Sequence, residues 1–181
     1  MSIVIVTPNQ EEALSIDEVK SYALRVEGSH DDPRIEGLII SARQRFETFC
    51  NRYLLETEID FYLTAFPFRG RIDLPTPLTA VSWIRYVNWS GVEQVMAASD
   101  YTVDTRREPG AVWAVYGAGW PATWPQPNAV RIRCIAGWPH VGDVPRPVID
   151  GLYLYISEQY DGQPRDSAYE SLWWPYRVTP L

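Results

Sequence analysis

The chain has 181 residues, of which 46% are hydrophobic and 22% are charged, and this composition is typical of a globular protein. No apolar run approaches the roughly 20 residues that a helix needs to cross a bilayer, which argues against a membrane protein. The formal net charge of -7 argues against tight DNA binding, because proteins that bind DNA tightly concentrate Lys and Arg against the phosphates.

The first eight residues, Met1 to Pro8, contain a short apolar patch but lack the basic region and the small-residue cleavage site of a signal peptide. We therefore expect a protein of a reducing cytoplasm. Cys50 falls within a helical pattern and Cys134 within a strand pattern. Both are expected to be small buried side chains and not partners in a disulfide.

Two helices are predicted in residues 1–55. Ser15 and Glu18 have the spacing of a capping box, which predicts a short helix that starts at Ile16 and frays at Gly28. A second helix is predicted from Asp32, as N-cap, with Pro33 at the first helical position. Its apolar residues recur at steps of three and four: Ile35, Leu38, Ile39, Ala42, Phe46, Phe49, Cys50 and Tyr53.

Residues 56–138 are predicted to form a β-rich insertion, because the apolar period changes to two and β-branched and aromatic residues dominate. Strands are expected at 59–65, 81–89, 92–96, 101–105, 111–115 and 129–136. Residues 119–127 are expected to be an ordered loop, because prolines at 121, 125 and 127 each remove a backbone donor.

Helical spacing returns in residues 139–165, which predicts a later helix that completes the bundle and ends near Asp161. Residues 166–181 are aromatic with little regular period and are expected to form an extended C-terminal arm. The predicted fold class is therefore α+β: a small helical bundle of two N-terminal helices and one later long helix, with a β-rich insertion and an extended C-terminal arm.

We find no catalytic constellation in the sequence. His30 adjoins Asp31 and Asp32, but three consecutive side chains rarely converge on one metal ion. His140 lies in a loop without a neighbouring nucleophile motif. Gly117 and Gly119 lack the third glycine of a dinucleotide fold, and no Walker-type motif occurs. The chain is therefore predicted not to be an enzyme, and no metal site is predicted.

The order of segments resembles the tailed-phage head-tail connector family, also called adaptor or head completion proteins, which includes those of gene transfer agents. The stretches that carry the resemblance are Ser15 to Lys20, Asp32 to Leu55, Ile72 to Pro75, Val81 to Tyr86, Asp100 to Asp104, Pro127 to Arg133, Ala136 to Gly137 and Trp174 to Val178. They are spread over most of the chain. The chain departs from the family pattern at Trp138-Pro139 and at the end of the later helix, Glu158 to Asp161.

The resemblance implies a structural protein of the virion neck that is made in the host cytoplasm. Subunits of this family form a ring, usually a dodecamer, below the portal protein, and the ring extends the DNA channel and docks the next neck or tail protein. The implied partners are the portal, a stopper or tail-completion protein, other copies of the chain, and passing genomic DNA that is not bound specifically. No cofactor and no membrane are implied.

Two other functions remain open. The chain could be a different neck component, such as a stopper or tail-completion protein. It could also be a carbohydrate-binding β module, because 8 Trp and 11 Tyr would suit such a surface, although these modules typically lack two N-terminal helices.

The C-terminal arm supplies the candidate portal-binding residues. Trp, Tyr and Arg are enriched among residues that dominate binding energy, and a short aromatic segment cannot form a core of its own. The candidates are Trp173, Trp174, Tyr176, Arg177 and Val178. The alternative is that the arm folds back through Trp173 and Trp174 onto the later helix.

Overall fold

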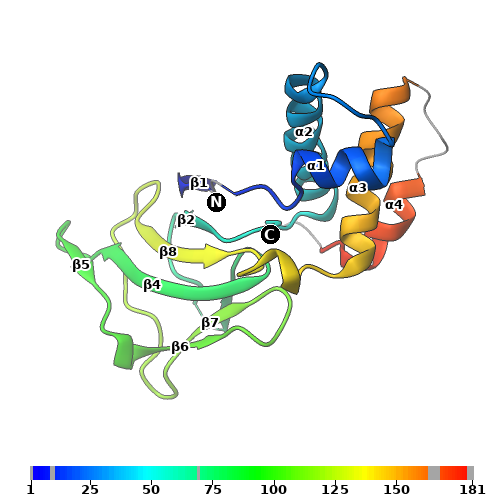
Figure 1. Ribbon diagram of the computed structural model, residues 1–181. Coiled ribbons are helices and arrows are strands. Elements are labelled where there is room, and N and C mark those ends of the chain that lie inside the picture. The colour runs from blue at the N-terminus through cyan, green and yellow to red at the C-terminus, as the bar shows by residue number, and fades with distance from the viewer. Residues whose placement is uncertain (1, 9–10, 69, 163–167, 179–181) are drawn as a thin grey trace. The chain divides into compact units, whose positions relative to one another are not determined.

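The computed structural model describes residues 2–8, 11–68, 70–162 and 168–178 (Figure 1). The chain forms two compact units. Of the described residues, the β unit contains 2–8 and 56–137, and the helical unit contains 11–55 and 138–178. The predicted α+β class is confirmed.

The helical unit begins with the predicted capping box. The Ser15 hydroxyl accepts from the Glu18 amide at 3.3 Å, and the Ser15 amide donates to the Glu18 carboxylate at 2.9 Å. Helix α1 (Ile16–Glu18) continues into a π-helical segment (Val19–Leu24). The π-helix ends before Arg25, which has a left-handed backbone, so this helix is shorter than predicted.

Helix α2 (Asp32–Cys50) is the helix that the apolar period predicts. The N-cap is Asp31 and not Asp32 as predicted. The Asp31 carboxylate makes no cap hydrogen bond and instead accepts from the Tyr160 hydroxyl at 2.6 Å. The predicted apolar stripe does face inward: Ile35, Ile39, Ala42, Phe46 and Cys50 are all buried.

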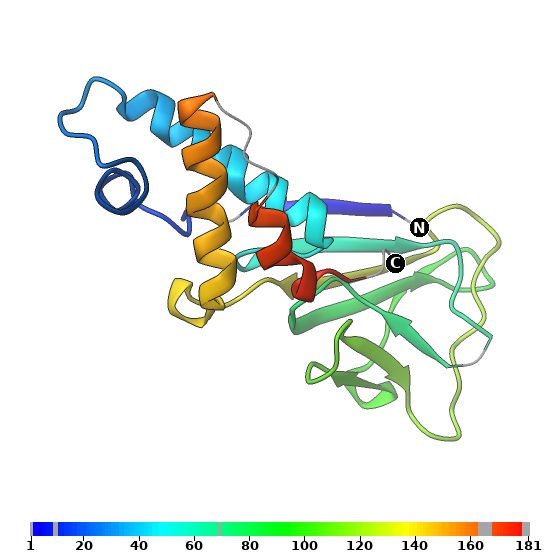
Figure 2. The same ribbon diagram turned by 90° about the vertical axis from the view of Figure 1, so that its right-hand side faces the viewer.

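Helix α3 (Arg146–Asp161) is the predicted later helix, and it follows a 3-10 turn (Val141–Asp143). It packs against α2 and against a further helix, α4 (Ala168–Trp173), as Figure 2 also shows. The segment predicted as an extended arm thus contains a helix, followed by a 3-10 turn (Trp174–Tyr176). No described helix is both long and apolar enough to cross a membrane.

The β unit contains a five-stranded antiparallel sheet of order β1-β2-β8-β4-β5 and a three-stranded sheet of order β3-β7-β6. The first sheet comprises β1 (Ser2–Thr7), β2 (Thr57–Leu63), β8 (Val130–Ala136), β4 (Leu78–Val87) and β5 (Glu93–Val95). The second comprises β3 (Arg71–Asp73), β7 (Ala111–Ala114) and β6 (Tyr101–Asp104). In Figures 1 and 2 the smaller sheet lies below the larger one.

Strand β8 shows why the sheet folds with one apolar face. Val130, Ile132, Cys134 and Ala136 are buried, whereas the residues between them are half-buried. Alternate residues of a strand point to opposite faces, so this pattern places one face in the core. The other face carries Arg131 and Arg133.

Strand β1 belongs to the β unit, although residues 1–55 are predicted to form the helical part. The sequence gives no signal for it, because Ile3 to Val6 are consecutive apolar residues without alternation. Pairing with β2, more than 50 positions further along the chain, makes it a strand.

Candidate interaction surfaces

Trp173 is a core residue of the helical unit. Its side chain is fully buried, and its ring lies edge-on to Phe46 at 5.4 Å and close to Tyr169 at 4.9 Å between ring centroids. The indole N–H donates to the Val148 carbonyl at 3.1 Å. The predicted portal-binding residue Trp173 therefore has no exposed surface, because its ring is enclosed by the helical unit.

Gly151 of α3 makes room for this indole. A Cβ placed on Gly151 would come within 2.2 Å of the Trp173 indole nitrogen. The absence of a side chain at Gly151 therefore lets the indole lie against the backbone of α3 and reach the carbonyl of Val148.

Trp174 behaves differently from its neighbour, since 63% of its surface is exposed. Its ring lies near Phe49 of α2, with 6.3 Å between ring centroids. The exposed Arg177 guanidinium lies over both rings, 5.4 Å from the Trp174 centroid and 5.5 Å from that of Phe49. Phe49, Trp174 and Arg177 therefore form a small aromatic and cationic surface, which we call the Trp174 surface.

Backbone hydrogen bonds hold the rest of this segment to the helical unit. The Val178 amide donates to the Cys50 carbonyl at 2.9 Å, and the Arg52 guanidinium donates to the Tyr176 carbonyl. Both side chains, Tyr176 and Val178, are half-buried. The segment thus folds back through Trp173 to Val178, as in the alternative considered above, and the remainder of the predicted arm, 179–181, lies outside the described residues.

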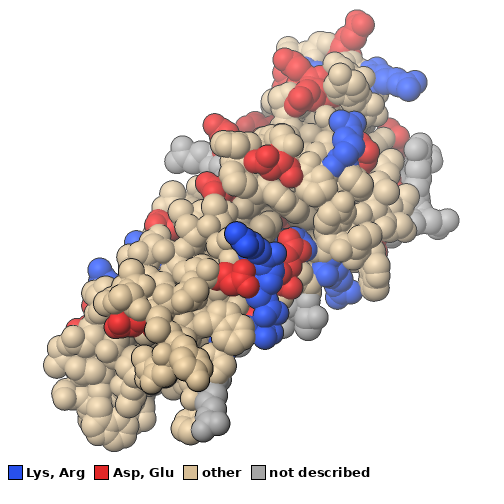
Figure 3. All heavy atoms as spheres, turned by 90° about the horizontal axis from the view of Figure 1, so that it is seen from below, with Lys and Arg blue, Asp and Glu red and all other residues tan. Residues whose placement is uncertain are grey.

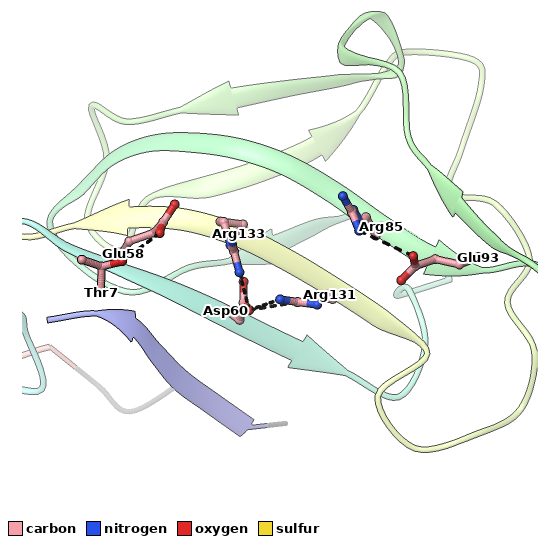
Figure 4. Close-up of polar contacts among 7 residues, drawn as sticks. All are labelled: Thr7, Glu58, Asp60, Arg85, Glu93, Arg131 and Arg133. Carbon is pink, nitrogen blue, oxygen red and sulfur yellow. Dashed lines mark hydrogen bonds and ion pairs between the residues drawn. The ribbon is translucent and has the colours of Figure 1, made fainter.

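The polar face of the five-stranded sheet carries an ion-pair cluster (Figure 4). Asp60 of β2 is 2% exposed and accepts from two arginines of the neighbouring strand β8. Arg133 donates to it through Nε and Nη2, each at 2.9 Å, and Arg131 donates through Nε at 2.9 Å. The cross-strand register brings these residues together, because Asp60 pairs directly with Arg133 and diagonally with Arg131.

The arginines of this face also stack on one indole ring. The guanidinium carbons of Arg85, Arg133 and Arg131 lie 4.5, 4.8 and 5.0 Å from the centroid of Trp83. Arg85 further pairs with Glu93 at 3.6 Å. The cationic groups are therefore occupied by carboxylates and an aromatic ring, which leaves less positive charge for an outside anion.

Burial would by itself raise the pKa of the Asp60 carboxyl, but the hydrogen bonds from Arg133 and Arg131 outweigh burial and lower it. Asp60 therefore stays ionised at neutral pH and keeps both arginines in place.

On the face seen in Figure 3, basic and acidic side chains adjoin near the middle, and wide areas around them carry no charged residue.

The residues tested for catalysis do not form a site. His30 and His140 are both exposed. Asp31 accepts from Tyr160, as described above, and Asp32 forms an ion pair with Lys20. Among the described residues, no group of three or more His, Cys, Asp or Glu side chains could hold a metal ion.

The prediction that the two cysteines are buried and unpaired is confirmed. Burial raises the pKa of the Cys50 thiol and that of the Cys134 thiol to about 12. Neither thiol has appreciable thiolate at neutral pH, so neither is a nucleophile in the folded protein.

At the sequence level, no protein-family model and no curated protein matches the chain. Solved structures do share its fold. The chain is 21% identical to a chain from the neck of an empty GTA particle computed with C6 symmetry, with a TM-score of 0.79. It is 22% identical to a chain from the virion of a native gene transfer agent (GTA) particle, and 19% identical to one from the neck of a native GTA particle computed with C12 symmetry, each with a TM-score of 0.78.

Each likeness covers 100% of this chain and 97% of the other. Both units, including β1 and α4, are therefore part of the shared fold. The chain has the fold of gene transfer agent neck and virion proteins, and the resemblance predicted from the sequence is confirmed at the level of the fold.

Proposed function

We propose that the chain is a structural subunit of a virion neck: a head-tail connector, or adaptor, that forms a ring below the portal. The likeness to neck and virion chains over the whole length carries this proposal. Two neighbours come from structures computed with C6 or C12 symmetry, which supports a ring of identical subunits and, for the adaptor, a dodecamer.

The charge of the chain supports a structural role in a DNA channel, without catalysis. The net charge is -7, and the arginines Arg131 and Arg133 are paired with Asp60. An acidic channel whose arginines are paired with carboxylates lets the phosphate backbone pass, because it does not cause the counterion release that drives tight binding. We infer a protein without enzymatic activity or cofactor, which waits in the host cytoplasm and then becomes part of the virion at the head-tail junction.

We infer that the Trp174 surface is the portal contact. Trp174 and Arg177 offer exposed side chains of the types that dominate binding energy. The buried Trp173 side chain anchors residues 173–178 in the core of the helical unit. Hydrogen bonds at the backbone of Tyr176 and Val178 attach the rest of this segment to the same unit. A rigid aromatic surface loses little conformational entropy on binding, which favours affinity.

The test is capture of the purified chain by portal-bearing heads of the particle that encodes it. Trp174→Ala and Arg177→Ala should each weaken capture about tenfold or more, as is usual for a central contact residue. Tyr22→Ala is the matched control, because Tyr22 is also in the helical unit and is 72% exposed. Its capture should stay at the wild-type level.

Equal capture of all three variants would show that the contact lies elsewhere. Failure of the wild-type chain to bind portal-bearing heads would contradict the adaptor role itself. In that case the alternative is another neck component, such as a stopper or tail-completion protein, and labelling of the chain in intact particles would show its position along the neck.

A further inference from the structure

Strand β1 is an edge strand with apolar side chains exposed on both faces. Ile3, Val4, Ile5 and Val6 are 43, 51, 52 and 38% exposed. The strand pairs only with β2, and no described strand pairs with its outer edge. Edge strands of monomeric proteins are usually protected by charges, prolines or coverage, and β1 carries no charged side chain and no proline.

The opposite edge of the same sheet is β5, and it is also exposed and partly apolar. Val95 is 63% exposed, and Val92, just before the strand, is 53% exposed. Two hydrogen bonds stabilise the turn before β5: the Asn88 side chain accepts from the amides of Ser90 and Val92, each at 3.0 Å.

The register places Val4 and Val95 on the same face of the sheet. Val4 pairs with Asp60, which pairs with Arg133. Val95 pairs with Arg85, which pairs with Arg131, two residues from Arg133. Residues two apart share a face of a strand, so both valines lie on the face of the ion-pair cluster shown in Figure 4.

The two edges also have matching polarity. Four antiparallel pairings separate β1 from β5, so the two strands run in the same direction. A second copy, rotated about an axis along the strands, would bring its β5 beside β1 as a parallel neighbour. This contact joins two different surfaces, so it can repeat from copy to copy and close into a ring.

We propose that the outer edge of β1 binds the β5 edge of a second copy of the chain, so that one sheet continues into the next. A copy fits better than an unrelated partner, because the two edges belong to one sheet, run in the same direction and both expose valine side chains. Pairing of β1 with another β1 would be antiparallel and would close as a two-fold dimer, leaving both β5 edges exposed.

The experiment cross-links the double variant Val4→Cys/Val95→Cys with a short bifunctional maleimide at about 1 mM protein, a concentration that populates weak complexes. The native cysteines stay unreactive, because they are buried and their pKa values are about 12. The linker cannot join the two edges of one chain, since five strands place them about 19 Å apart. A denaturing gel should show a ladder of dimers, trimers and larger products.

Each single variant should stay monomeric on the gel. Dimers from Val4→Cys alone would overturn the proposal in favour of β1–β1 pairing, and the absence of a ladder from the double variant would overturn it as well. Val95→Cys/Val141→Cys is the control for random collision, because Val141 is 39% exposed and lies outside both edges. An equal ladder from this control would also count against the proposal.

The role of this contact in a ring rests on the proposed function, whereas the contact itself does not. The cross-link needs only the purified chain, and the capture experiment needs portal-bearing heads. A ladder without portal capture would refute the adaptor role and support the edge pairing. Portal capture without a cross-linked ladder would support the adaptor role and refute the edge pairing.

Discussion

Because Trp173 lies so close to Gly151, we expect alanine at this position to lower the free energy of unfolding, and Gly37 serves as the control. Replacing a glycine in the middle of a helix by alanine normally stabilises a protein by about 0.5–1 kcal/mol. Gly37 of α2 should follow this rule, because a Cβ there would meet nothing within 4 Å. Gly37→Ala should therefore raise the free energy of unfolding by about that amount.

Gly151→Ala should have the opposite sign. The new Cβ would lie 2.2 Å from the Trp173 indole nitrogen and 2.8 Å from two ring carbons, so the ring has to move. Overpacking of this kind costs about 1–3 kcal/mol, and loss of the hydrogen bond to Val148 adds about 1 kcal/mol. After subtracting the gain in helix propensity, we expect a net loss of about 1–3 kcal/mol.

Urea denaturation followed by the helical circular dichroism signal measures both variants, with the slope of each transition checked against wild type. Because the neighbours interact directly, Gly151→Ala should cost less in a Trp173→Phe background than in wild type. If the two glycine variants were equally stable, or if the cost were unchanged in that background, the inferred packing of Trp173 on α3 would be refuted.

Four further outcomes are expected. Phe46→Ala should lower the free energy of unfolding by about 3–5 kcal/mol, because Phe46 is fully buried, and a melting temperature close to wild type would contradict this. Asp60→Asn should cost about 1–3 kcal/mol at neutral pH, because Arg131 and Arg133 lose a charged partner. Folding lowers the pKa of Asp60, so the stabilisation that this carboxylate gives is present above the unfolded pKa and is lost as the pH falls through the folded pKa. Below about pH 4, urea titrations should therefore show a steeper fall in the free energy of unfolding for wild type than for Asp60→Asn. Affinity for duplex DNA at physiological salt should be weak and independent of sequence, and submicromolar binding in a fluorescence anisotropy titration would be inconsistent with this. The free chain at micromolar concentration should be a monomer by native mass spectrometry, whereas a stable closed ring would show that assembly does not wait for the portal.

Local signals in the sequence were enough for the elements whose stability is local. The capping box at Ser15 and Glu18 forms as predicted, because its hydrogen bonds join residues three apart. The apolar period of α2 places Phe46 and Cys50 in the core, because an amphipathic helix has one way to bury its stripe. The apolar period changes to two near residue 56, and strand β2 begins at Thr57, because alternate side chains of a strand lie on the same face.

The tertiary structure decided what depends on distant partners. Strand β1 exists because β2 pairs with it, and the cluster around Asp60 exists because register aligns β2 with β8. Neither can be predicted from the sequence, because the interacting residues are 51 to 73 positions apart. The adjacent residues Trp173 and Trp174 are alike in sequence, yet one is buried and the other is exposed. Only α3, with the space left by Gly151, determines which of the two indoles is part of the core and which is available to a partner.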